Sequence, residues 1–205
     1  DPGTHAAGLQ TTSASTAPST TAARGAVPTS PDDLVARFRV VLGGTAEFEV
    51  TQEFTLPPPS SSKNPQPPGT ASTVTPQGVD PDDSAGALVG GTLTAAGVTG
   101  SVALTIYSSD SEPGEWCNSP FAEDCDVSTL PDGSRLATAT ARPAAGAVSY
   151  LACAKRPDGT MILLRVGNQE DPQGAVPGSP GSAVYAPQPP LTLDQLKAIV
   201  TSDKW

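Results

Sequence analysis

Aromatic and charged residues are scarce in this chain of 205 residues, at 4% and 16% of the total. So little charge is typical neither of a coiled coil nor of a charge-rich disordered tail. Glycine (20 residues) and proline (23 residues) are abundant instead. We therefore expect one folded domain with long irregular segments, because a chain of this length allows one domain or at most two.

Basic residues are also few. Eleven Lys and Arg face 21 Asp and Glu, which gives a formal net charge of −10. With no cluster of Lys or Arg, this balance argues against nucleic acid as a partner. No apolar run approaches the roughly 18 residues of a membrane helix, and no signal peptide is recognisable. We expect contact with a membrane only through an anchor outside this chain.

Histidine occurs once, at His5, and cysteine three times. A Ser/His/Asp or Cys/His catalytic set needs a histidine beside its nucleophile, and a structural zinc site needs four ligands. The sequence also contains no dinucleotide-binding, phosphate-binding-loop or HExxH pattern. We therefore expect no catalytic residues, no cofactor and no metal.

The composition divides the chain into a tether and one domain. Residues 1–29 consist almost entirely of Ala, Gly, Ser, Thr and Pro, so they cannot bury enough surface to offset the entropy of ordering. We interpret them as a flexible tether. Residues 30–205 form the domain, with a disordered proline-rich excursion at 57–84 and a second Pro/Gly loop at 172–182.

A helix is expected directly after the tether. Ser30 is a good N-cap, Pro31 suits the first helical position, and Asp32 and Asp33 suit the positive end of the helix dipole. Apolar residues then recur with a helical period, and a pair of glycines ends the segment. The apolar positions are Leu34, Val35, Phe38, Val41 and Leu42, followed by Gly43 and Gly44.

Strands are expected through the middle of the chain. In residues 46–53 apolar and acidic residues alternate, with Ala46, Phe48, Val50 and Gln52 on one face. Further strands are predicted at 87–95, 100–108, 126–130, 134–141, 147–155 and 160–166. The tripeptides Pro131-Asp132-Gly133 and Pro157-Asp158-Gly159 are typical turns. Residues 126–166 should therefore form an antiparallel meander.

A second helix is marked near the end of the sequence. Thr192 and Gln195 have the spacing of a capping box, and Leu191 can pack on Leu196 as a hydrophobic staple. We expect Trp205 to dock on the sheet. Helices at both ends and strands between them predict an α+β fold, an antiparallel sheet of about five to seven strands with both helices packed on one face.

The cysteines indicate the compartment. Cys117 and Cys125 are eight residues apart in a polar loop, where a disulfide would stabilise the fold by on the order of 3 kcal/mol. Cys153 lies in an apolar strand and is interpreted as a buried thiol, although its pairing with either loop cysteine stays open. A disulfide beside a tether favours an extracytoplasmic location, in the cell envelope or secreted.

An acidic loop surrounds the proposed disulfide and is our candidate binding loop. A solvated surface is the ordinary explanation for such a loop, but calcium, with Asp80, Asp82 and Asp83 as further oxygen ligands, or a cationic partner remain alternatives. Paired carboxylates for glycosidase chemistry are disfavoured by the lack of aromatic residues. The candidate residues are Asp110, Glu112, Glu115, Trp116, Phe121, Glu123, Asp124 and Asp126.

Several segments together resemble the ectodomains of uncharacterised single-pass membrane proteins and lipoproteins of actinobacteria. These segments are the tether, the helix before Gly43-Gly44, the loop from Cys117 to Cys125 with the following 127–136, and the ending from Leu191 to Trp205. The motifs are structural, so the resemblance implies relatives and a compartment. Some proteins of this kind are associated with extracytoplasmic-function sigma factors, which implies a sensor or regulator.

These observations lead to one main hypothesis. We expect a monomeric, non-enzymatic extracytoplasmic domain of a membrane-anchored envelope protein that binds a protein or envelope ligand and is linked to sigma-factor signalling. The alternative is a structural envelope lipoprotein without a signalling role.

Overall fold

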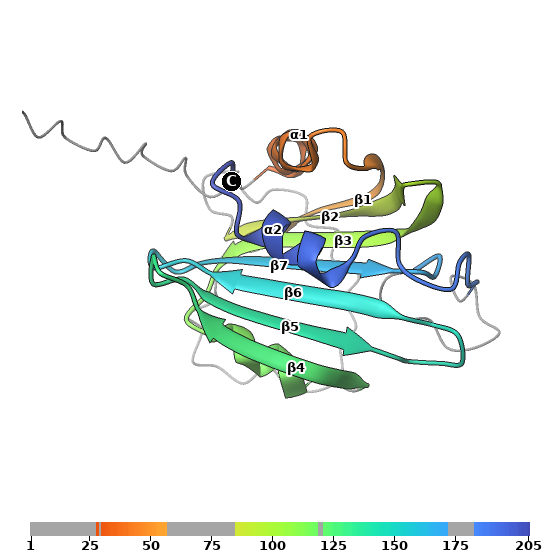
Figure 1. Ribbon diagram of the computed structural model, residues 1–205. Coiled ribbons are helices and arrows are strands. Elements are labelled where there is room, and N and C mark those ends of the chain that lie inside the picture. Colours follow the sequence, from red (N-terminus) through yellow and green to blue (C-terminus); the bar gives the residue numbers. More distant parts are fainter. Residues whose placement is uncertain (1–27, 29, 57–84, 119–120, 172–182) are drawn as a thin grey trace, which may run out of the picture.

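The computed structural model describes residue 28 and residues 30–56, 85–118, 121–171 and 183–205. They form a seven-stranded antiparallel sheet with the strand order β1-β2-β3-β7-β6-β5-β4 and helices on one face (Figure 1). The expected α+β fold is confirmed. The proposed tether, proline-rich excursion and second loop lie, apart from Pro28, outside the described residues.

The strands follow the chain in two groups. The first group forms one half of the sheet and the second group is the predicted meander, which β7 joins to β3. Their bounds are β1 Glu47–Leu56, β2 Gly86–Ala95, β3 Val98–Ser108, β4 Ala122–Thr129, β5 Arg135–Ala141, β6 Ser149–Lys155 and β7 Thr160–Gly167.

Both predicted helices are present and cover the same face of the sheet (Figure 1). Helix α1 spans Pro31–Leu42, with Ser30 as its N-cap and Gly43 as its C-cap. The φ of Gly43 is 56°, in the left-handed region that favours glycine. Helix α1 packs on β1 and β2. Helix α2, Leu193–Val200, has the complete capping box of Thr192 and Gln195, and packs mainly on β6.

The turns of the meander are built as the sequence predicted. The Asp132 carboxylate accepts a hydrogen bond from the Ser134 amide at 2.8 Å, and Asp158 accepts one from Thr160 at 2.9 Å. The glycines that follow these aspartates have φ of 87° and 89°. Because the two turns share the same hydrogen bond and the same glycine conformation, the repeated tripeptide is explained by two equivalent hairpin turns.

In strand β1, Gln52 lies on the opposite face of the sheet from the one predicted. A bulge between Val50 and Gln52 inserts one residue, so Val50 pairs with Gly91 while Gln52 pairs with Gly90. Neighbouring residues of β2 point to opposite faces, and Gln52 therefore leaves the face of Phe48. The alternation of residues in the sequence could not predict this change of face, because a bulge adds a residue and interrupts the two-residue period of the strand.

Strand β4 is also longer than predicted. It begins at Ala122, four residues before the expected start, and contains a register shift between Glu123 and Asp126. Cys125 consequently lies in this edge strand and not in a loop. The segment before it forms the 3-10 helix η2, Pro113–Asn118, where the sequence had suggested an irregular loop.

The placement of Trp205 adds a partner that the sequence did not predict. Its ring stacks on Phe38 of α1. The indole nitrogen donates a hydrogen bond to the Ile199 carbonyl at 2.6 Å. The ring is buried and belongs to the main core between the helices and the sheet. Its partner is thus a helix that is distant in sequence.

Candidate functional site

The face of the sheet opposite α1 and α2 contains the site. On this face the register aligns residues from β2, β3 and β7 in rows across the strands. One row joins Leu88, Thr105 and Leu163, and the rows on either side contain Arg165 and Tyr107. Because the helices cover only the other face, this side of the central strands depends on other elements for cover.

A cleft of about 290 Å³ opens on this face. Small side chains of β3 form its floor. Thr105 lies between Leu88 of β2 and Leu163 of β7, and Ala103 lies between Gly90 and Arg165. The volume is near the lower end of the usual range for small-molecule sites, about 300–1,000 Å³. The lining residues are Leu56, Leu88, Ala103, Thr105, Tyr107, Trp116, Leu163 and Arg165.

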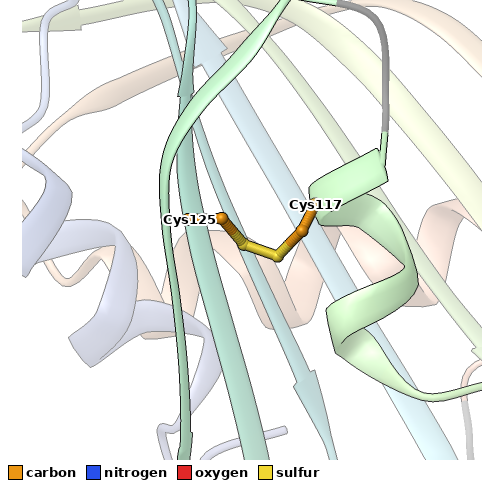
Figure 2. The surroundings of a disulfide bond; sticks show 2 residues. All are labelled: Cys117 and Cys125. Carbon is orange, nitrogen blue, oxygen red and sulfur yellow. A yellow bond between two sulfur atoms is a disulfide. The ribbon is translucent and has the colours of Figure 1, made fainter.

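The 3-10 helix η2 forms one wall of the cleft through Trp116. It packs on β4 and β5, so it covers the meander half of this face, and among the described helices none packs on the β2 and β3 half of the same face. The disulfide between Cys117 and Cys125 joins η2 to the edge strand β4 (Figure 2). The sequence predicted this disulfide, which holds Cys117, the residue after Trp116, close to β4.

Ion pairs hold the segment before η2 against the sheet. Glu112 lies 3.7 Å from Lys155 and 3.9 Å from Arg135, and the Lys155 ammonium donates a hydrogen bond to the Asp110 carbonyl at 3.2 Å. Exposed pairs of this kind stabilise by about 0–1 kcal/mol each. Their effect here is to position η2, together with the disulfide.

The hydroxyl of Tyr107 lies beside Trp116 at one end of the cleft. Burial raises the pKa of the Tyr107 phenol above its ordinary value, and so does the nearby Cys153 thiol, while a hydrogen bond with Trp116 opposes part of the shift. An indole N–H is only a donor, so the phenol oxygen accepts this bond. Tyr107 is therefore a neutral polar group at neutral pH.

The Cys153 thiol is buried in β6, as the sequence predicted. Its sulfur contacts the Met161 sulfur at 3.3 Å, and burial raises the pKa of the thiol to about 12. A thiol with this pKa has almost no thiolate at neutral pH, and thiolate is the reactive form. Cys153 therefore acts as a packed apolar group.

The guanidinium of Arg165 lies at the opposite end of the cleft from Tyr107. Partial burial lowers the pKa of Arg165, and the charge of Asp171 opposes that shift. Even so, an arginine stays protonated at neutral pH because its ordinary pKa is above about 12. The cleft therefore has an apolar body and one positive end.

None of the acidic residues of the candidate binding loop is among the described residues that line the cleft, although Glu115 is close enough to act on Tyr107. Glu112 forms the ion pairs described above, and Glu123 lies 3.4 Å from Arg142. Asp110, Glu115, Asp124 and Asp126 are exposed. Across the part of the chain that the structure describes, no three or more His, Cys, Asp or Glu side chains are grouped to hold a metal ion.

The two aromatic residues of the candidate loop have different environments. Trp116 is half-buried as a wall of the cleft. Phe121 is 63% exposed and has a φ of 67°, beside a short stretch outside the described residues. The structure thus brings Trp116 to the cleft together with residues of the sheet and leaves Phe121 apart from them.

The sequence reasoning missed most of the cleft. Leu88, Thr105, Tyr107 and Arg165 all lie in strands that the sequence predicted, on the face opposite the helices. The alternation in β7 offered a signal, since Arg165 interrupts an otherwise apolar strand. Only the strand order could show that this arginine shares a surface with Trp116.

Comparisons with known proteins found no match to a family model, to a curated protein or to a solved structure. Among the helices of the described residues, none has both the length and the apolar character needed to cross a membrane.

Proposed function

We propose that this chain is a non-enzymatic extracytoplasmic binding domain of a membrane-anchored envelope protein, and that its ligand occupies the cleft on the helix-free face. The cleft itself is the observation that carries the proposal. Its described lining offers aliphatic, aromatic and hydroxyl groups and one guanidinium, but no carboxylate, imidazole or thiol. Such a lining is suited to holding a molecule rather than to acid–base or nucleophilic chemistry.

The described helices cover the two faces of the sheet unequally, and this difference supports a binding role. Among the described elements, two helices cover one face, whereas the other face is covered on the β4 to β6 side by η2 alone (Figure 1). Phe54, which pairs with Leu88 beside the cleft, is 55% exposed. An apolar surface that continues from a cleft onto an open sheet is typical of a binding site.

The compartment is supported by the disulfide between Cys117 and Cys125, because such bonds persist in oxidising environments. Protease treatment of intact cells tests this part of the proposal. We expect the domain to be digested from outside without cell lysis. Protection in intact cells and digestion only after lysis would refute the extracytoplasmic location.

Binding is tested with an organic extract of bacterial envelopes, followed by native mass spectrometry of the protein. We expect the wild-type protein to retain an added mass and an Ala103→Trp variant, which fills the cleft, to lose it. Val40→Trp adds the same bulk on the exposed surface of α1 and is the matched control. Thr105→Phe is a second variant if Ala103→Trp unfolds. Equal retention by the cleft variants and the control would refute binding in the cleft.

The resemblance to actinobacterial ectodomains extends the proposal to signalling through a sigma factor. Deletion of the domain should then change the expression of a defined gene set. If deletion instead weakens the envelope without changing gene expression, the domain is a structural lipoprotein component.

A further inference from the structure

Arg165 is the charged group of the cleft and has no partner among the described residues. Among the described residues, no ion pair within 4.0 Å and no hydrogen bond joins its guanidinium to another side chain or carbonyl, and the charge of Asp171 acts on it from nearby. A half-buried cation without a partner is unusual, since desolvation of a charge is costly unless it is paired.

Every other arginine in the described part of the chain has an acceptor. Carboxylates or backbone carbonyls fill this role in each case. The pairs are Arg37 with Asp33, Arg39 with the Phe48 carbonyl, Arg135 with Glu112, Arg142 with Glu123, and Arg156 with the Ser202 carbonyl. Arg165 is therefore the arginine that is left for an external anion.

Two serine hydroxyls add unmet hydrogen-bonding capacity at the same end of the sheet. Ser101 and Ser149 both pair with Gly167, one row beyond Arg165 on the same face. Their side chains are 1% and 3% exposed, and neither Oγ has a hydrogen-bond partner among the described residues. Buried hydroxyls normally have a hydrogen-bond partner. The hydroxyls of Ser101 and Ser149 therefore have unused hydrogen-bonding capacity at this end of the sheet.

The remainder of the described lining is mostly apolar, and its residues follow one another along the strands. From Arg165 it passes Leu163 and ends at Tyr107 and Trp116, four residues further along the strand register, or about 13 Å at 3.3 Å per residue. A volume of 290 Å³ holds about ten water-sized groups at about 30 Å³ each. The cleft thus matches a single chain of about ten carbon atoms.

Charge selects the head group of such a chain. The described lining of the cleft offers one positive charge, with the Asp171 carboxylate nearby and a net charge of −10 on the whole chain, so a group with a single negative charge is favoured over a doubly charged one. A carboxylate has one charge and two coplanar oxygens, which match the planar guanidinium in a bidentate pair.

We propose that the cleft binds a single-chain amphiphile with one terminal carboxylate, of the medium-chain fatty acid class. The carboxylate pairs with Arg165, and the chain lies over Leu163 and Thr105 towards Trp116. This inference rests on the proposed binding function, because it assigns a ligand class to the same cleft.

Isothermal titration of the purified chain with four ten-carbon probes tests the assignment. The probes are decanoate, decan-1-ol, decyl phosphate and decyltrimethylammonium, each below its micellar concentration. We expect decanoate to bind at least tenfold more tightly than decan-1-ol, and decyltrimethylammonium not to bind. Tighter binding of decyl phosphate than of decanoate, or equal binding of decanoate and decan-1-ol, would overturn the carboxylate assignment.

Variants separate the head-group contact from the apolar contacts. Arg165→Gln should reduce decanoate affinity at least tenfold and leave decan-1-ol affinity unchanged. Ala103→Trp should abolish the binding of both. Arg142→Gln, which removes a cation remote from the cleft, is the control and should change neither. Unchanged decanoate binding by a folded Arg165→Gln variant would refute the proposed role of Arg165.

The outcome also distinguishes this inference from the proposed function. If decanoate does not bind but an envelope component is still lost on Ala103→Trp substitution, the cleft is a binding site and the ligand class is wrong. If neither decanoate nor any envelope component depends on the cleft, both proposals are wrong.

Discussion

The indole ring of Trp205 stacks on the ring of Phe38, with centroids 6.2 Å apart and ring planes inclined by 18°. Phe38 in turn meets Phe48 of β1 edge-on at 5.0 Å. Three rings from α1, β1 and the segment after α2 therefore form one aromatic cluster. Aromatic pairs of this geometry stabilise by about 0.5–1.5 kcal/mol beyond the burial of their area.

Replacement of Trp205 by alanine should accordingly destabilise the domain strongly. The variant loses the stacked ring, its buried area and the hydrogen bond to the Ile199 carbonyl. We expect a loss of about 3–5 kcal/mol in the free energy of unfolding, measured by urea denaturation. Lys204→Ala, at an exposed neighbour, should change stability by less than about 0.5 kcal/mol. A similar small effect for Trp205→Ala would contradict the observed packing.

Removal of the disulfide should have a moderate effect on stability. The double substitution of Cys117 and Cys125 by serine releases a constraint on the unfolded chain worth on the order of 3 kcal/mol. It also frees η2 from β4, so the wall formed by Trp116 should become mobile. We expect lower stability in urea and a red-shifted Trp116 emission, measured in a Trp205→Phe background. An unchanged midpoint and spectrum would show that the ion pairs of Glu112 suffice.

Cys153 should behave as a protected thiol. Thiol counting under denaturing, non-reducing conditions should give one thiol per chain, and the native protein should react with the same reagent only slowly at pH 8. The reason is burial, which raises the pKa of Cys153 to about 12 and excludes the reagent. Three thiols in the denatured protein would disprove the disulfide. One thiol that reacts rapidly in the native state would disprove the burial.

Stability should fall as the pH rises above about 9. Cys153 and Tyr107 both have raised pKa values in the folded state because burial disfavours their charged forms. Each group therefore contributes stability that is complete below its unfolded pKa, about 8.5 for cysteine and about 10 for tyrosine, and is lost as the pH rises through the folded pKa.

Two conservative variants test this pH dependence. Cys153→Ala and Tyr107→Phe remove the titrating groups, so the double variant should lose less stability between pH 8 and pH 11 than the wild type. Tyr185→Phe, at an exposed tyrosine, is the control and should retain the wild-type slope. Parallel slopes for all three proteins would rule out these groups as the cause.

The capping box of α2 offers a local test. Thr192 accepts a hydrogen bond from the Gln195 amide at 3.2 Å, and the Gln195 side chain accepts one from the Thr192 amide at 2.8 Å. Thr192→Ala should cost about 1 kcal/mol in unfolding free energy. Thr192→Ser keeps the oxygen and should stay within a few tenths of a kcal/mol of the wild type. Equal losses for alanine and serine would show that the hydroxyl is not responsible.

Local chemistry was predictable from the sequence wherever neighbours in the chain decide the structure. The caps at Ser30 and Thr192, the paired turns at Asp132 and Asp158, and the disulfide all follow from residues within a few positions of one another. The features that the sequence did not predict have distant causes. The bulge beyond Val50 depends on the pairing with β2, and Trp205 finds its partner in α1, far away in the sequence.

The candidate site shows the same division. Trp116 was selected from the acidic loop, but the residues that share its cleft come from β1, β2, β3 and β7. The approximate positions of the strands, the turns and the presence of Arg165 in an apolar strand could be read from the sequence, whereas the bulge in β1 and the true start of β4 could not. The position of this arginine on the face opposite the helices, without a hydrogen-bond acceptor among the described residues, follows from the tertiary structure. The physical reason is that strand order and helix placement depend on long-range burial, which local patterns do not specify.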